Sequence, residues 1–156
     1  MPTPRLPSAD ELPNLPLRTD EALLERVRAL VQPALRRQLW FLLLDERDCQ
    51  LPVLLPMDIP ARPAPGETGG IADFAEALAE FLDAVAAAGA AASLVIVYER
   101  PGPAELRTAD GVWFRFLGEV EALARTPIRA LAFVAGRQVR LIPRELRSAS
   151  SAEAAS

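Results

Sequence analysis

Histidine and lysine are both absent from this chain of 156 residues, so all 17 basic residues are arginines. Their absence excludes a histidine general base, a Ser-His or Cys-His nucleophile pair, a histidine metal ligand, a P-loop lysine and a lysine Schiff base. A codon bias typical of GC-rich genomes accounts for the arginine, alanine and proline content. The composition therefore excludes most well-known hydrolase and transferase mechanisms, and we expect no catalytic residue, no metal and no cofactor.

Cysteine is nearly absent as well. Cys49 is the only one, which excludes an intrachain disulfide and a thiolate zinc cluster. The chain does not open with a basic segment followed by an apolar one, and its longest apolar run, AVAAAGAAASLVIV, has 14 residues, too few to cross a bilayer. The net charge of −4 argues against a nucleic-acid partner. We therefore expect a cytoplasmic protein with no membrane and no nucleic-acid contact.

The rest of the composition is that of one globular domain, with 51% hydrophobic and 24% charged residues. Five prolines within residues 1–18 predict a flexible, extended arm. Leucines of this arm could dock on the domain or on a partner: Leu6, Leu12, Leu15 and Leu17. Residues 19–143 form the predicted α/β domain, and residues 144–156 a predicted disordered tail.

Hydrophobic periodicity predicts the element order α-β-β-α-β-α-β-β. The expected helices begin at Thr19, Ile71 and Thr108, and the expected strands cover 38–45, 50–57, 93–99, 128–134 and 137–143. Pro52 and Pro56 place the second strand at a sheet edge, because proline donates no ladder hydrogen bond. Gly89 suits the end of the middle helix. We expect a single, three-layer-like α/β (mixed α+β) domain with a mixed sheet of about five strands and about three helices.

The first predicted strand, QLWFLLLD, is apolar on both of its faces. Trp40 and Phe41 are neighbours, so their side chains must point to opposite sides of the sheet. A strand buried on both faces needs cover from helices or from a second subunit. Phe114 falls off the apolar face of its predicted helix and, with these two aromatics and the leucine-rich arm, indicates a subunit interface, as in a homodimer.

The stretch LVIVYERPGPAELRTAD, residues 94–110, predicts a buried strand, a rigid loop and a helix start, which is where open α/β sheets build ligand sites. Its polar residues form the candidate ligand site: Glu99, Arg100, Arg107, Thr108 and Asp110. In this hypothesis Arg100 or Arg107 binds an anion, and the free backbone amides at the start of the helix near Thr108 also donate to it. In the alternative, the proline-glycine loop stiffens a crossover and the charges pair on the surface.

Acidic residues gather at two other places. The turn Asp45-Glu46-Arg47-Asp48 offers oxygen ligands for magnesium or calcium, or else is a solvated hairpin tip. A row of acidic residues along the middle helix is either its solvent-exposed face or a surface that binds a basic partner: Asp73, Glu76, Glu80 and Asp83.

The element order and the 94–110 loop resemble the bacterial RadC type of the JAB/MPN metalloprotease domain, over roughly residues 38–143. In that family a strand ends in H-x-H-P-S-G and a helix begins with P-S-x-x-D. Here Tyr98-Glu99-Arg100-Pro101-Gly102 and Thr108-Ala109-Asp110 lie at those places, and LAFVAGRQVRLIP resembles the closing strands. The chain is also similar to actinobacterial α/β domains with a Val-Val-Tyr strand and an alanine-rich helix, a similarity that implies no activity.

The resemblance implies a site without its metal. The family's two histidine ligands fall on Tyr98 and Arg100, and its aspartate falls on Gly111, one residue after Asp110. A permanent cation and a neutral phenol are unsuited to hold zinc. The leading hypothesis is therefore a non-catalytic domain that binds a protein partner or itself, as a metal-free relative of this family. The alternative is a protein or enzyme that binds a small anionic ligand at the 99–110 loop.

Overall fold

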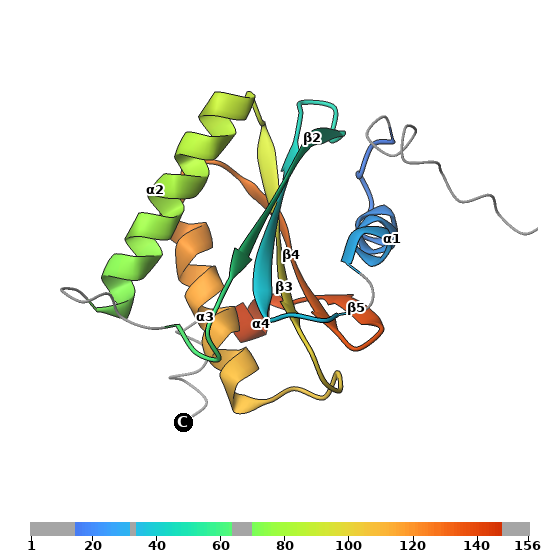
Figure 1. Ribbon diagram of the computed structural model, residues 1–156. Helices are drawn as coiled ribbons and strands as arrows, with labels where there is room; N and C mark the ends of the chain where they lie inside the picture. The colour runs from blue at the N-terminus through green and yellow to red at the C-terminus, as the bar shows by residue number, and fades with distance from the viewer. Residues whose placement is uncertain (1–14, 32–33, 64–69, 148–156) are drawn as a thin grey trace, which may run out of the picture.

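The computed structural model describes residues 15–31, 34–63 and 70–147, and these form one mixed α/β domain (Figure 1). Its elements follow the predicted order, with a short helix added at the end: α1 (Asp20–Val31), β1 (Gln38–Leu44), β2 (Gln50–Asp58), α2 (Ile71–Gly89), β3 (Ser93–Arg100), α3 (Thr108–Leu123), β4 (Ile128–Ala135), β5 (Gln138–Leu141) and α4 (Arg144–Arg147). None of the described helices is long and apolar enough to span a bilayer.

The five strands form one sheet in the order β2-β1-β3-β4-β5. Both hairpins are antiparallel, β1 is antiparallel to β3, and β3 and β4 are parallel because α3 crosses over between them. The carboxyl ends of β3 and β4 therefore lie side by side, followed by the loop 101–107 and by the turn before β5. This is the edge of the sheet where the sequence places the candidate site.

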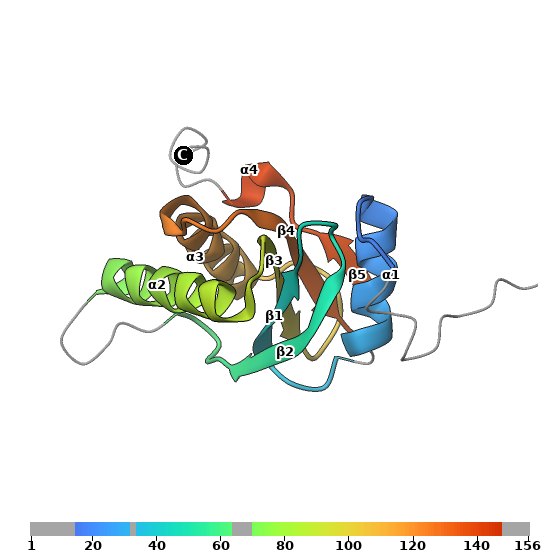
Figure 2. The same ribbon diagram turned by 90° about the horizontal axis from the view of Figure 1, so that it is seen from above.

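Helices cover both faces of the sheet, so the domain has three layers (Figure 2). Alternate residues of β3 point to opposite sides: Leu94, Ile96 and Tyr98 pack in the core under α2 and α3. Val95 and Val97 pack in the second core, with Leu23 and Val27 of α1. Helices of this chain thus cover the apolar residues on both faces of the strands. These residues therefore give no reason to expect a second subunit.

Both edges of the sheet carry features that hinder pairing with another strand. Pro52 and Pro56 lie in the edge strand β2, as predicted, and remove two of its backbone donors. At the other edge β5 has only four residues, and α1 lies alongside it. Both edge strands are therefore poorly suited to pair with a further strand.

Three expectations from the sequence are wrong in detail. Phe114 is not exposed: it is buried and packs edge-on against Tyr98 and Phe133. Leu17 of the predicted arm docks on the domain, one of the two alternatives that the sequence leaves open, and is buried in the core on the α1 side, so the predicted start of the domain at residue 19 is too late. Residues 144–147 of the predicted tail form α4, which packs on α3.

The same expectations also concern the other leucines of the arm and the other two aromatic residues. Leu15 is exposed, whereas Leu6 and Leu12, the rest of the arm and residues 148–156 lie outside the described residues. Phe41 is buried in the core under α2, so of the three aromatics expected at an interface Trp40 alone is half exposed.

Candidate functional site

Strand β3 separates the predicted site residues onto two faces of the sheet. Arg100 points toward α3 and meets Asp110 there, whereas Glu99 points toward the α1 side. The reason is the strand's period of two, which sends neighbouring side chains in opposite directions. The predicted cluster is therefore two separate polar networks.

Arg100 is fully buried and is held entirely by protein atoms. Its Nε and Nη2 donate to the two carboxylate oxygens of Asp110 at 2.7 and 2.8 Å. The other guanidinium hydrogens go to loop carbonyls: those of Pro101 and Pro103 from Nη1, and that of Glu105 from Nη2. A guanidinium has five N–H groups, so Arg100 has none left for an anion. Arg100 instead ties the loop after β3 to the start of α3.

Asp110 is the acceptor at the centre of this network. Besides Arg100, it accepts from the Tyr98 hydroxyl at 3.0 Å and from the backbone N–H of Arg107 at 2.8 Å. Burial alone would raise the pKa of Asp110, but the hydrogen bonds from Arg100, Arg107 and Tyr98 bring it below its usual value. Asp110 is thus a carboxylate at neutral pH, and its charge is compensated by Arg100.

Tyr98 links the network to the segment before β1. Its hydroxyl accepts from Nη1 of Arg37 at 3.0 Å while it donates to Asp110. Burial, with the neighbouring Asp110 charge, raises the pKa of Tyr98 above its usual value. The phenol therefore stays neutral and serves as a hydrogen-bonding bridge in the core.

Glu99 forms the second network, on the α1 side of the sheet. Its Oε1 accepts from Nε2 of Gln38 at 2.6 Å and from Nε1 of Trp40 at 2.7 Å. Its Oε2 accepts the backbone N–H of Leu35 at 3.0 Å. Glu99 thus ties Leu35 and the Trp40 side chain to the end of β3.

Arg107 and Thr108 remain at the surface. Arg107, not Thr108 as the sequence indicates, is the residue before the first turn of α3, and the Asp110 carboxylate caps its backbone N–H. The guanidinium of Arg107 lies over Gly102, whose added Cβ would come within 2.8 Å of Nη2. Gly102 also has a φ of 94°, a conformation that favours glycine.

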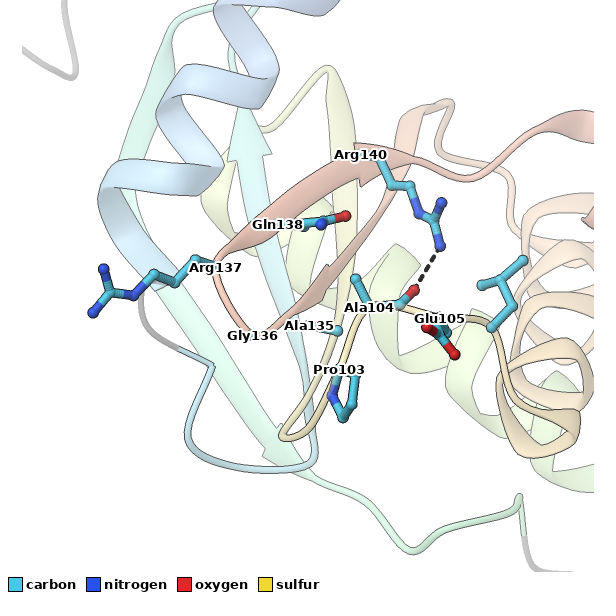
Figure 3. A pocket seen from close by; sticks show the side chains of 9 residues that line it. Pro103, Ala104, Glu105, Ala135, Gly136, Arg137, Gln138 and Arg140 are labelled. Carbon is cyan, nitrogen blue, oxygen red and sulfur yellow. Dashed lines mark hydrogen bonds between the residues drawn. The ribbon is translucent and has the colours of Figure 1, made fainter.

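A hollow of about 750 Å³ opens beside the loop, on the α3 side of the sheet (Figure 3). We call it the loop hollow; its lining residues are Pro103, Ala104, Glu105, Leu106, Ala135, Gly136, Arg137, Gln138 and Arg140. Arg140 points across it and donates to the Ala104 carbonyl at 2.8 Å, whereas the Arg137 side chain points away. The loop is therefore one wall of an open depression, with β5 as the other.

Sequence reasoning missed Gln138 and Arg140. A signal for them exists: the glycine turn at Gly136 fixes the hairpin register, which places Arg140 opposite Phe133. Phe133 belongs to the face under α3, so its cross-strand partner must lie on that face too.

The residues at the positions of the family's ligands do not fit zinc. Tyr98 and Arg100, at the positions of the two histidines, both bond to Asp110, whereas the position of the family's aspartate is Gly111, which has no side chain. The guanidinium, a permanent cation, fills the middle of the arrangement and uses both oxygens of the only carboxylate. No group of three potential ligands gathers anywhere else in the described residues either.

Three residues of the two other acidic groups have structural partners. Asp45 accepts hydrogen bonds from the backbone N–H groups of Cys49 and Arg47. Both bonds lower the pKa of Asp45, and the bond from Cys49 has the larger effect. Asp83 accepts from Arg125 and Thr126 after α3. Burial raises the pKa of Asp83, and these hydrogen bonds more than offset that, leaving the pKa below its usual value. Asp73 accepts the N–H of Gly70 at the start of α2, so the acidic row is not one uniform wet face.

Comparison with models of known protein families gives no match, and a search of curated protein sequences gives none.

Proposed function

We propose that this chain is a non-catalytic protein-interaction or self-association domain, a metal-free relative of the JAB/MPN fold. One observation carries the proposal: the charged groups at the carboxyl end of β3 are bonded to each other and to the loop. Arg100 and Asp110 are both buried completely, and all five guanidinium hydrogens are used inside the protein. Arg100, at the position of a metal ligand in the family that the sequence resembles, thus holds a loop in shape.

Apolar side chains on the surface support an interaction role. Leu106 beside the loop hollow is 49% exposed, and Phe81 of α2 and Leu123 of α3 are 44% and 48% exposed. A protein partner that covers such side chains gains roughly 25 cal/mol for each Å² of apolar surface removed from water. We place this function in the cytoplasm, where a single cysteine stays reduced.

Light scattering and proximity labelling together test the proposal. Light scattering on a size-exclusion column measures self-association over a wide concentration range, and proximity labelling in cells measures association with other proteins. We expect either a dimer whose fraction rises with protein concentration, or a set of labelled proteins that differs from the set labelled by the same enzyme diffusing freely in the cell. A monomer throughout, together with labelling equal to that of the free enzyme, would contradict it. So would stoichiometric zinc in tag-free protein, or peptide cleavage that Asp110→Asn abolishes.

A second candidate is the binding of a small anion, now at the loop hollow and not at Arg100. The specific observation is that Arg107 and Arg140 are exposed beside the same loop, and the hollow between loop and β5 can admit a ligand. A thermal-shift screen with nucleotides and metabolites tests it. We expect a raised Tm that Arg140→Ala removes; equal stabilisation of that variant would eliminate the candidate.

A further inference from the structure

The loop hollow has a floor and a wall from separate parts of the chain. Ala135 of β4 with Gln138 and Arg140 of β5 form the floor, on the sheet face to which Phe133 belongs. Residues 103–106 form the wall, held in place by the buried Arg100. Because both parts are fixed by hydrogen bonds, a ligand here would meet a preformed surface.

The charges around the hollow are mainly positive. Arg140 makes one hydrogen bond among the described residues, to Ala104, and its guanidinium lies 5.2 Å from the centre of the Phe133 ring. Four of its five N–H groups therefore remain for a ligand. Arg107 lies over Gly102, and the Gly102 carbonyl lies next to the Gly136 turn that borders the hollow. Glu105 is the one acidic side chain in the lining.

An apolar strip accompanies these charges. Leu106 is half exposed, and the exposed Pro103 and half-buried Ala104 line the hollow with it. A small anion would use the arginines but leave this strip in water, and an open depression does not enclose a small ligand as typical ligand pockets do. An extended peptide with carboxylates and an apolar side chain uses both.

We propose that the loop hollow binds an acidic peptide segment of a partner protein, with Arg140 as the carboxylate anchor and Leu106 as the apolar contact. This inference rests on the proposed interaction function and names its partner class. A charge-assisted bond from a guanidinium is about twice as strong as a neutral one, and the Phe133 ring holds this guanidinium in place. The protein's overall charge of −4 would repel an acidic peptide elsewhere, so the arginines also select the place of binding.

Fluorescence anisotropy with a labelled peptide of alternating glutamate and leucine tests this inference. We expect saturable binding that weakens as salt is added, because exposed charges are screened. Arg140→Ala should weaken binding about tenfold, and Leu106→Ser should also weaken it. Both side chains lie at the surface, so circular dichroism should show unchanged folds.

Two matched controls make the result specific. Arg47→Ala removes an exposed arginine at the β1–β2 turn, at the other end of the sheet, and should leave binding unchanged. The same peptide with glutamine in place of glutamate should not bind. Binding of the glutamine peptide, or equal losses from Arg47→Ala and Arg140→Ala, would overturn the inference.

Two further outcomes also overturn it. Free glutamate that displaces the peptide at a similar concentration would mark a small-anion site. No binding of the peptide would exclude an acidic segment, and if proximity labelling still finds partners, the interaction function stands with another surface.

Discussion

A buried guanidinium is stable only when its charge and its hydrogen bonds are satisfied in the protein, and Arg100 meets both conditions. Asp110 supplies the opposite charge, and three loop carbonyls take the remaining hydrogens. Removing one partner of such a pair typically costs about 3–5 kcal/mol, because the other charge stays buried alone. At the scale of single residues, this pair explains why the loop after β3 has a defined shape.

Another residue under local constraint is Ala90, which follows α2 with a φ of 56°. Gly89, the glycine that the sequence suggests as the helix end, is the last helical residue and lies close to Leu43, with an added Cβ at 3.0 Å from Cδ2. A non-glycine residue in the left-handed region costs about 1–2 kcal/mol. We therefore expect Ala90→Gly to raise the free energy of unfolding by about 1 kcal/mol, measured by urea denaturation.

The control for this prediction is the same substitution inside the helix. Ala88→Gly changes an exposed residue with helical geometry and should lower the free energy of unfolding by about 1 kcal/mol. If both variants lose stability equally, Ala90 is not strained.

Among the elements, α4 depends on one glycine of α3. A Cβ at Gly118 would overlap the carbonyl oxygen of Arg147, and Arg147 also donates to Glu121 at 2.9 Å. We expect Gly118→Ala to displace α4 and lower the free energy of unfolding by about 1–3 kcal/mol, as overpacking does. Faster hydrogen exchange at Glu145–Arg147 would show the displacement.

Gly111 provides the matched control on the same helix. An added Cβ there meets nothing within 4 Å, so Gly111→Ala should gain up to about 1 kcal/mol from helix propensity. Equal gains in both variants would mean that α4 does not pack against Gly118.

The elements themselves follow from local patterns, and the sequence therefore predicts them well. Period-two and helical spacing give the correct order, and Pro52 and Pro56 correctly place β2 at an edge. The candidate site depends on pairing between elements, which local patterns do not contain. Glu99 and Arg100 are adjacent in sequence yet face different layers, and Phe114 is buried because Tyr98 and Phe133 lie beneath it.

At the scale of the whole molecule, helices cover both faces of the sheet, and a depression lies beside the loop after β3. The inner network of Tyr98, Arg100 and Asp110 holds the wall of that depression, while Arg140 and Leu106 face outward. A position that carries a metal centre in the family that the sequence resembles thus supports a binding surface in our proposal. In this proposal Arg100 and Asp110 serve structure.

A double-mutant cycle measures this structural role, with the free energy of unfolding of Arg100→Met, Asp110→Leu and the double variant determined in urea. We expect each single variant to lose about 3 kcal/mol or more, since each leaves a buried charge without its partner. The double variant should lose less than the sum by about 2 kcal/mol or more, because no unpaired charge remains. Single variants that each change stability by less than about 0.5 kcal/mol, with additive effects, would contradict the claim.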